Sequence, residues 1–411
     1  VGVVYLRDGA RVFTLLEDSG VEGDRATVAN AVLADFDGDG ILDLFAARGS
    51  TVYVDTDLFY LGNGDGSFTP AHDGGPNHLW RNDGGGTFTE VGVEVGFAAL
   101  PTGNYYLQST GYGTDVEPGA EPGTYIGSNG FGLDCGDVTG DGLMDVFVTA
   151  ISHPSNTDEV RKWSDPSHLL INQGPDAGYT LVNEWLVRGL PYNEGDVDGA
   201  LVDFDNDGRL DLSISREKKY EGSYSDPDQK SWFGLMRQLK DGSFESLGYA
   251  SGINDPEDFE WLRMRGAQNH AWADIDSDGD LDLLVGGRDQ GGGRPNFLFR
   301  NDHGSKNAWL SVHLEGDGRE VNRDAIGARV TLTDEDTLRV AEVRSSRGMY
   351  NSEDTRTLYF GLFGLDGDSL LEVQWPDGTS ASFEARHDFG QDMHLRITYP
   401  DQLCIEGETC P

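Results

Sequence analysis

The amino-acid sequence predicts an all-β protein in which four-strand units stack radially into a β-propeller, followed by a β-rich C-terminal region. Three observations predict this fold. An acidic nine-residue loop occurs four times between short apolar segments, a strand–turn–strand pattern follows each loop, and glycine supplies 57 of the 411 residues. Because no single unit of this kind can bury its own faces, radial stacking is the arrangement that gives the repeats a core. We expect no helix longer than two turns.

The acidic loop has the sequence DFDGDGILD at residues 35–43. It recurs as DVTGDGLMD from Asp137, DFDNDGRLD from Asp203 and DIDSDGDLD from Asp274. Positions 1, 3, 5 and 9 carry oxygen-bearing side chains and position 6 is glycine, which is the spacing of a tight loop around a calcium ion. The closing acid is at position 9 and the flanks are strand-like, so we expect the loop to turn a β-hairpin rather than to join two helices.

We therefore predict about four calcium ions, each held by the side chains at positions 1, 3, 5 and 9 and by the main-chain carbonyl at position 7. Thr139 replaces an aspartate in the second loop, so that site should be the weakest. The alternative is that the Asp-Gly loops are only hairpin turns, and four copies in the same register disfavour it. The predicted ligands are Asp35, Asp37, Asp39, Ile41 and Asp43; Asp137, Thr139, Asp141, Leu143 and Asp145; Asp203, Asp205, Asp207, Arg209 and Asp211; and Asp274, Asp276, Asp278, Asp280 and Asp282.

A second repeat follows each acidic loop and consists of a strand, a polar glycine-containing turn and another strand. Each unit should therefore be a pair of hairpins, and the uneven spacing of the loops favours a propeller over a solenoid. Two shorter versions occupy residues 3–16 and 59–70. The four full copies are HLWRNDGGGTFTEV (78–91), HLLINQGPDAGYTLV (168–182), FGLMRQLKDGSFESL (233–247) and NFLFRNDHGSKNAWLSV (296–312).

The C-terminal region alternates apolar and polar residues, as half-buried strands do. The clearest segments are AWLSVHLEG (308–316), ARVTLTD (328–334), LRVAEVRS (338–345) and SLLEVQWPDG (369–378).

Charge and composition exclude some classes of partner. The chain has 72 acidic and 30 basic residues and a formal net charge of −42, which disfavours nucleic acid and anionic membranes as partners. No apolar stretch is long enough to span a membrane, and the first residues do not have the pattern of a signal peptide. Cys404 and Cys410 are close enough to form a disulfide, which would fit an oxidising compartment, and Cys135 should be a buried thiol.

One histidine is placed where an active site would be expected. His270 lies four residues before the fourth acidic loop, on an expected inner strand, at a position that Ala31, Leu133 and Gly199 match in the other units. We expect a hydrogen-bonded histidine that lines the central channel rather than a metal ligand. The sequence contains no G-x-S-x-G, H-E-x-x-H or P-loop motif, which favours a protein without enzymatic activity. A hydrolase that uses two catalytic carboxylates stays open.

Two family resemblances extend these predictions. The acidic loops resemble the calcium-binding FG-GAP repeats of integrin α-subunit propellers. A propeller followed by an ASPIC/UnbV domain is the arrangement of the cartilage acidic protein family. The absence of an N-x-Ser/Thr acceptor site and of an EGF-like module favours a bacterial-type member. The segments that resemble the ASPIC/UnbV domain are NRDAIGARVTL (322–332), EVRSSRGMYNSED (342–354), LYFGL (358–362) and VQWPDGT (373–379).

The resemblance implies a seven-bladed calcium-binding propeller over residues 1–308, an ASPIC/UnbV-like domain over 309–400 and a tail over 401–411. It also implies an exported scaffold, secreted or at the cell surface, that binds an extracellular protein or polysaccharide through the propeller rim, without membrane insertion. Two alternatives stay open. One is a glycan-active enzyme or lectin, with Trp232 and Trp261 stacking on sugar rings. The other is a metal-dependent tailoring enzyme that uses the central channel.

Overall fold

The computed structural model describes residues 4–7, 13–16, 18–21, 28–48, 61–62, 68–69, 77–97, 130–150, 167–191, 195–216, 233–253, 267–287, 296–334, 337–348, 352–362, 369–385 and 389–407. Nearly every regular element in these ranges is a strand, and the single α-helix, α1 (Gly92–Val95), is one turn long. The predicted all-β class is confirmed. None of the helices in the described ranges combines the length and the apolar composition that crossing a membrane requires.

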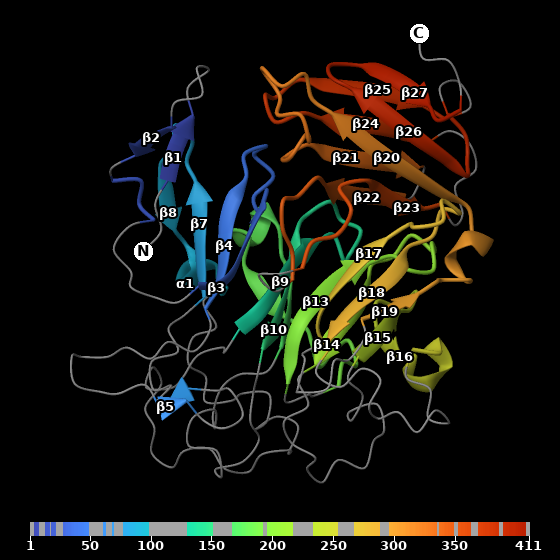
Figure 1. Cartoon of the computed structure of the whole chain (residues 1–411). Helices are drawn as coiled ribbons and strands as arrows, with labels where there is room; N and C mark the ends of the chain where they lie inside the picture. The colour runs from blue at the N-terminus through green and yellow to red at the C-terminus, as the bar shows by residue number, and fades with distance from the viewer. Residues whose placement is uncertain are drawn as a thin grey trace.

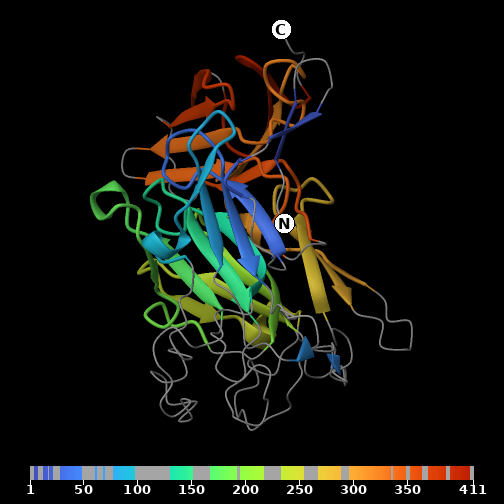
Figure 2. The same ribbon diagram turned by 90° about the vertical axis from the view of Figure 1, so that its left-hand side faces the viewer.

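Four antiparallel sheets stand side by side, and we call them array sheets one to four (Figures 1 and 2). In each of them the strand order follows the chain order. Sheet one contains β3 (Val28–Ala34), β4 (Asp43–Arg48), β7 (His78–Asn82) and β8 (Phe88–Glu90), and sheet two contains β9 (Gly130–Gly136), β10 (Asp145–Ala150), β11 (His168–Asn172) and β12 (Leu181–Asn183). Sheet three contains β13 (Asp196–Val202), β14 (Asp211–Arg216), β15 (Phe233–Gln238) and β16 (Phe244–Ser246), and sheet four contains β17 (Ala267–Ala273), β18 (Asp282–Gly287) and β19 (Phe297–Phe299).

The first strand of each array sheet is its inner strand. β9 lies against both β3 and β13, and β13 lies against β17, so the inner strands are neighbours as they are in a propeller. The two shorter repeats form the hairpins β1 (Val4–Arg7) with β2 (Phe13–Leu16) and β5 (Leu61–Gly62) with β6 (Phe68–Thr69). Closure of the sheets into a propeller and its seven blades remain predictions.

Neighbouring array sheets are held together by apolar side chains from both facing surfaces. Phe45 of sheet one and Val146 of sheet two belong to one buried cluster. Phe147 of sheet two and Leu212 of sheet three belong to another. Both faces of a sheet between two neighbours are buried, and every residue of β10 and β14 is accordingly buried. β10 is accordingly apolar on both faces. β14 alternates Leu212 and Ile214 with Ser213 and Ser215, and these buried hydroxyls contact His270.

The C-terminal region is a sandwich of two four-stranded sheets. One sheet has the order β23-β20-β26-β27 and the other β22-β21-β24-β25. Alternate residues of β24 are buried, as predicted from its sequence, and β25 has the same pattern. In Figure 1 the sandwich lies above the array. Its strands are β20 (Trp309–Glu315), β21 (Arg329–Asp334), β22 (Thr337–Glu342), β23 (Leu358–Gly361), β24 (Leu370–Gln374), β25 (Ser380–Glu384), β26 (Met393–Thr398) and β27 (Gln402–Ile405).

β27 lies inside the segment that we expected to be a tail, and it pairs with β26. Cys404, in this strand, is buried and disulfide-bonded. Cys410, its expected partner, lies outside the described residues. Cys135 is a buried free thiol, as predicted.

The expected pair of hairpins is wrong for the last repeat. The segment that should have been the fourth strand of sheet four is β20, which instead pairs with β23 on one edge and with β26 on the other. In that position both edges of β20 have hydrogen-bonding partners, and Leu310, Val312 and Leu314 are buried in the sandwich core. An outer strand of the array would have one paired edge only, which explains why the chain leaves sheet four here.

The close approach of the inner strands gives a testable prediction. A Cβ added at Gly199 of β13 would lie 2.2 Å from Phe147 Cε1 and 2.7 Å from Thr149 Cγ2. Gly199→Ala should therefore destabilise the protein by about 1–3 kcal/mol through overpacking. Chemical denaturation followed by intrinsic fluorescence measures the effect, and an unchanged midpoint would show that sheets two and three are not packed this closely.

Candidate metal centres and the interdomain polar core

Each acidic loop connects the first two strands of an array sheet and is folded by its own first aspartate. In the first loop, Asp35 accepts hydrogen bonds from the backbone N–H groups of Asp39 (3.1 Å) and Gly40 (3.0 Å). The other three loops repeat both contacts. Gly40 has a φ of 86°, in the region that favours glycine. The aspartate at position 1 therefore shapes the turn in addition to offering oxygen atoms to a metal.

The aspartate at position 9 links its loop to the rest of the sheet. Asp43 accepts hydrogen bonds from the N–H groups of Phe36 (2.9 Å) and Asn82 (2.7 Å), and Asn82 is the last residue of the third strand. The other three loops make the same pair of contacts. The motif spacing did not reveal this role. The repeated first and last aspartates thus have a structural reason that is independent of any ion.

Three of the four loops bring carboxylates together. In each group, one oxygen atom of every member lies within 4.8 Å of the others. Asp43, Asp207 and Asp278 lie outside the groups, and in the second loop the described residues form none, which is where Thr139 replaces an aspartate. Calcium binding by the predicted ligands stays a prediction. The groups are Asp35, Asp37 and Asp39; Asp203, Asp205 and Asp211; and Asp274, Asp276 and Asp282.

The residues at position 7, where we predict a main-chain ligand, have different side-chain environments. Ile41 is exposed and Leu143 is half-buried. The guanidinium of Arg209 pairs with Asp207 and neutralises a carboxylate of its own loop. Asp280 is fully buried and accepts a hydrogen bond from the N–H of Ser305 (2.7 Å).

The third loop is the one whose chemistry best fits a cation. The side chain of Asp205 is buried, and its Oδ1 has no hydrogen-bond partner in the part of the chain that the structure describes. Burial raises the pKa of Asp203 to about 7, and the carboxylates of Asp207 and Asp205 add to that increase. A divalent cation would satisfy the unpaired oxygen and compensate the crowded negative charge. The residues present therefore fit calcium.

All four acidic loops contact the C-terminal sandwich. In the first loop the N–H of Asp35 donates to Glu342 (3.3 Å), and in the second Arg329 donates to the carbonyl of Gly142. In the third loop Asp203 accepts from the N–H of Gly361 (3.2 Å). In the fourth loop Gly279 packs on Trp309 of β20, and burial together with the carboxylate of Asp274 raises the pKa of Tyr359. The loops thus lie at the interface between the array and the sandwich rather than on a free rim.

A polar segment of the sandwich crosses the inner strands, and we call it the axial segment, residues 344–348 and 352–354. It follows β22 and contacts the inner strand of each array sheet at the position that the repeats had aligned. Ser346 donates to the carbonyl of Ala31 (3.0 Å), Gly348 exchanges backbone hydrogen bonds with Leu133 (3.1 and 2.7 Å), and Arg347 donates to the carbonyls of Gly199 (3.2 Å) and His270 (2.8 Å). The axial segment therefore occupies the place where we expected a channel.

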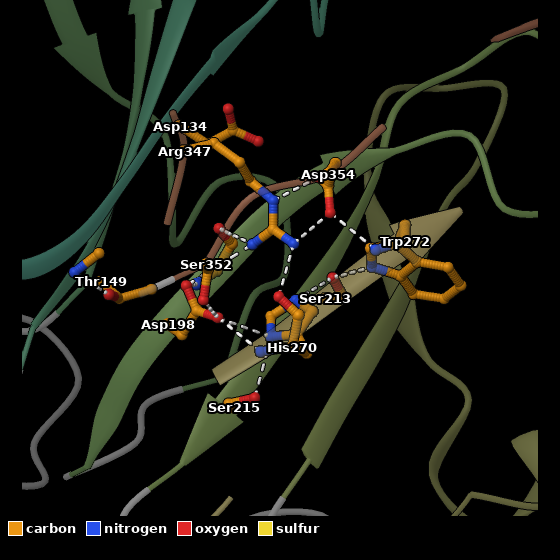
Figure 3. Close-up of polar contacts among 12 residues, drawn as sticks. Asp134, Thr149, Asp198, Ser213, Ser215, His270, Trp272, Arg347, Ser352 and Asp354 are labelled. Atoms are coloured by element: carbon orange, nitrogen blue, oxygen red, sulfur yellow. Dashed lines mark hydrogen bonds and ion pairs between the residues drawn. The ribbon is translucent and has the colours of Figure 1, made fainter. Parts of the chain in front are cut away.

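Arg347 is the centre of the buried polar network in Figure 3. Its guanidinium lies between Asp354, which it contacts through two nitrogens, and Asp198, which is 3.6 Å from Nη1. Ser352 also donates to Asp198 (2.7 Å), and Asp354 accepts from the N–H of Trp272 (2.7 Å). Burial lowers the pKa of Arg347, but the carboxylates of Asp354 and Asp198 raise it above its ordinary value, so the guanidinium stays charged.

His270 is a hydrogen-bonded histidine at the inner strand, as predicted. Its Nδ1 lies 3.1 Å from Asp198 Oδ2, and its Nε2 lies 2.8 Å from the hydroxyl of Ser213. The three residues have the order of a catalytic Asp-His-Ser relay. However, Ser213 is fully buried and its hydroxyl also accepts from the indole N–H of Trp272 (3.0 Å). The arrangement is thus a buried network that joins sheets three and four, and not an accessible nucleophile.

Arg344 is a second arginine of the axial segment that forms an ion pair with an inner strand. Arg344 pairs with Asp134 of β9 (2.5 Å) and donates to the carbonyl of Cys135. Sequence reasoning missed Asp134, Asp198 and both arginines, because acidic residues are too common in this chain to single any of them out. The available signal was the EVRSSRGMYNSED segment, in which two arginines and several small polar residues interrupt the alternating strand pattern.

Comparison with known families and proteins supports part of the resemblance. Residues 318–402 match the family model described as ASPIC and UnbV. The chain is 24% identical to cartilage acidic protein 1 of Xenopus tropicalis over 308 residues, which are 75% of this chain and 39% of that protein. It is 23% identical to the Mus musculus protein of the same name over 83% of this chain and 44% of that protein. The ASPIC/UnbV domain and this weak similarity support the cartilage acidic protein family.

Two further findings complete the comparison. The chain is 24% identical to cartilage acidic protein 1 of Homo sapiens and covers 41% of its length, so the chain spans only about two fifths of these relatives. The crystal structure of the V. cholerae biofilm matrix protein Bap1 aligns with 89% of this chain and 60% of that chain at 8% identity. Its TM-score of 0.22 is too low to indicate a shared fold.

The polar network predicts a large effect of one substitution. Arg347→Met leaves Asp198 and Asp354 buried without their cation and should destabilise the protein by about 3–5 kcal/mol. Arg347→Lys should not restore stability, because an ammonium cannot contact Asp354 and two carbonyls with the same geometry. Arg319→Met, on an exposed residue, is the control. Urea denaturation measures all three variants, and equal midpoints for Arg347→Met and Arg319→Met would show that the network does not hold the fold.

Proposed function

We propose that the protein is an exported, non-enzymatic scaffold in which calcium ions in the acidic loops fasten the C-terminal sandwich to the array. The observation that carries this proposal is that each of the four loops contacts the sandwich through residues beside its predicted ligands. Asp203 illustrates the coupling, because the same Oδ2 accepts the N–H of Gly208 within the loop and that of Gly361 in the sandwich. An ion that orders this carboxylate also orders its contact with the sandwich.

Electrostatics give the reason for an ion at this interface. Two carboxylates about 4 Å apart repel by about 4 kcal/mol at an effective dielectric constant near 20. Within the third loop Asp207 pairs with Arg209, and among the described residues Asp205 Oδ1 is buried without a hydrogen-bond partner. Calcium would convert this repulsion into coordination, with Asp203, Asp205 and Asp211 as the ligands that already converge. Sodium would screen the charges without supplying the same coordination.

The similarity to known proteins and the disulfide support a proposal for where the protein acts and what it binds. Similarity to cartilage acidic protein 1 and a disulfide at Cys404 both favour an extracellular scaffold, because disulfides persist in oxidising compartments. The partner we propose is an extracellular protein or polysaccharide. Repulsion by the net charge of −42 disfavours nucleic acid and anionic lipid.

The alternative functions have less support. A metal-dependent enzyme in the central channel would need space where the axial segment contacts all four inner strands. Trp232 and Trp261, which a lectin or glycan-active enzyme could use, lie outside the described residues.

Calcium removal tests the proposal. Chelation at low salt should lower the melting temperature by several degrees, and calcium should restore it fully but sodium chloride only in part. A ligand at a hundred times its dissociation constant adds about 2.7 kcal/mol per site. Asp205→Asn should lower the melting temperature in calcium and change little after chelation, whereas the exposed Asp401→Asn should do neither. Equal effects of Asp205→Asn in both buffers would contradict metal binding at this residue.

A separate experiment distinguishes the scaffold from the glycan-active alternative. The purified protein is applied to a glycan array, and any sugar that it binds is then incubated with it and assayed for cleavage or oxidation. The scaffold proposal expects no turnover of a bound sugar. Turnover that persists after repurification would establish an enzyme and reject the proposal.

A further inference from the structure

The fourth strands of sheets one to three share one packing arrangement. Each begins with a large apolar residue opposite the amide residue that ends the third strand. Leu181 and Phe244 are buried in the clusters that join their sheets to the preceding sheets. In sheet four Asn301 takes the place of the amide residue, because its N–H donates to Asp282 (2.8 Å) as Asn82 does to Asp43. The three pairs are Asn82 with Phe88, Asn172 with Leu181 and Gln238 with Phe244.

The segment that precedes each array sheet also follows a repeat, and in sheets one to three it lies beside the fourth strand of that sheet. A glycine with left-handed φ occurs at residues 20, 96, 189 and 252. A Cβ at the first three would lie 2.1, 2.9 and 3.5 Å from the carbonyl oxygens of Phe88, Leu181 and Phe244, whereas a Cβ at Gly252 would meet no atom of the described residues within 4 Å. None of the residues that the structure describes therefore occupies, beside Gly252, the space that the fourth strand takes in the other sheets.

This open space continues into a cavity of about 670 Å³ between sheets three and four. Its apolar walls include Phe204, Leu235, Ile253, Trp272, Leu283 and Phe299. These residues belong to the apolar cluster between sheets three and four. The corresponding clusters between the preceding sheets contain Leu181 and Phe244 of the fourth strands. The cavity thus lies where a fourth strand of sheet four would place its apolar side chain. We call the cavity and the adjoining edge of β19 the fourth-strand site.

The edge of β19 offers the backbone groups that such a strand would use. No described strand pairs with this outer edge. In sheets one and two the residue that follows the fourth strand donates its backbone N–H to a carbonyl of the third strand. Val91 donates to Leu79 and Glu184 to Leu169, both at 2.8 Å. Leu298 is the matching acceptor in sheet four. Ser251 likewise matches Ser19 and Arg188, whose carbonyls accept from Phe88 and Phe244.

We infer that the fourth-strand site binds an extended peptide segment of another protein, which adds to β19 as an antiparallel strand. The segment places one large apolar side chain, phenylalanine or leucine, opposite Asn301 and into the cavity. Strand addition of this kind takes its affinity from main-chain hydrogen bonds and its specificity from side-chain pockets. The inference does not depend on calcium in the acidic loops, because every contact that carries it comes from the strands and the cavity between them.

The charged residues around the cavity indicate which residues the bound segment should carry beside its apolar anchor. Arg237, Arg300, His303 and Lys306 line the site in a chain that has 72 acidic residues and 30 basic ones. Arg237 pairs with Glu245 and Arg300 with Asp302, whereas Lys306 is exposed and has no acidic partner among the described residues. Asp302 also lines the site, and both arginines interact with aspartates of the acidic loops as well. Lys306 is therefore the cation available to a partner, and the bound segment should carry an acidic residue that reaches it.

A pair of glycine variants tests whether the site is open in the free protein. Gly252→Asn and Gly96→Asn place the same side chain on similar left-handed backbones, with φ of 74° and 87°. Gly252→Asn should change the melting temperature by less than about 2 °C, whereas Gly96→Asn should lower it by roughly 5 °C or more by displacing Leu181. A loss of stability in Gly252→Asn as large as in Gly96→Asn would show that a segment of the same chain fills the site, and would overturn the inference.

Peptide binding tests the partner. The probe is a fluorescein-labelled peptide of residues 240–249, KDGSFESLGY, which reproduces the fourth strand of sheet three. Fluorescence anisotropy should show saturable binding to the full chain, weakened at least about tenfold by Phe244→Ser in the peptide. Gly252→Asn in the protein should abolish binding, and Lys306→Glu should weaken it several-fold at low salt.

Three outcomes would reject the assignment. The first is no binding of the probe at millimolar peptide. The second is binding that Gly252→Asn leaves intact, because the peptide would then lie elsewhere. The third is self-association of the protein that Gly252→Asn prevents, because the occupant would then be a second copy of this chain. Repeating the titration with chelator separates this test from the calcium proposal, since binding should persist there as long as the protein remains folded.

Discussion

The guanidinium of Arg347 sits where the inner strands of sheets three and four meet the sandwich, and it is almost completely removed from water. A charge in that place is stable only if its donors have partners, and here the partners come from three parts of the chain. Two carbonyls belong to inner strands, Asp198 belongs to β13, and Asp354 lies in the axial segment itself. Neither the array nor the sandwich alone could satisfy this group, so the network makes the two regions depend on each other.

The acidic loops add a second set of contacts around this centre. Their first and last aspartates are already committed to backbone hydrogen bonds, which explains why these positions recur in the same register. The position-5 aspartates share a further backbone hydrogen bond, because each accepts from the N–H of the residue at position 7. The position-3 residues have no such contact in common, and among the described residues Asp205 Oδ1 of the third loop is buried without a partner. Three aspartates thus shape each turn, and the crowded carboxylates of the third loop carry the charge that a cation would balance.

The last array sheet shows what happens when a repeat ends. Its first three strands follow the pattern of the others, including the amide residue Asn301 and the contact to Asp282. The next strand then enters the sandwich, because β20 has a paired neighbour on both edges there and buries three aliphatic side chains. The transition between the two regions thus leaves an apolar cavity beside an edge of β19 that pairs with no described strand.

The sequence by itself determined the features that depend on neighbouring residues. The all-β class, the four loops between paired strands, the alternating C-terminal strands and a hydrogen-bonded His270 were all readable, because a strand's side-chain period and a turn's glycine are local properties. Only the tertiary structure decided that the loops face the sandwich, that Arg347 reaches Asp198 and that β20 leaves sheet four. The contacts of the loops and of Arg347 join residues more than a hundred positions apart. The place of β20 depends on which of two sheets the same strand joins. Such choices depend on which surfaces can bury the most area and satisfy the most hydrogen bonds, and no local pattern records that comparison.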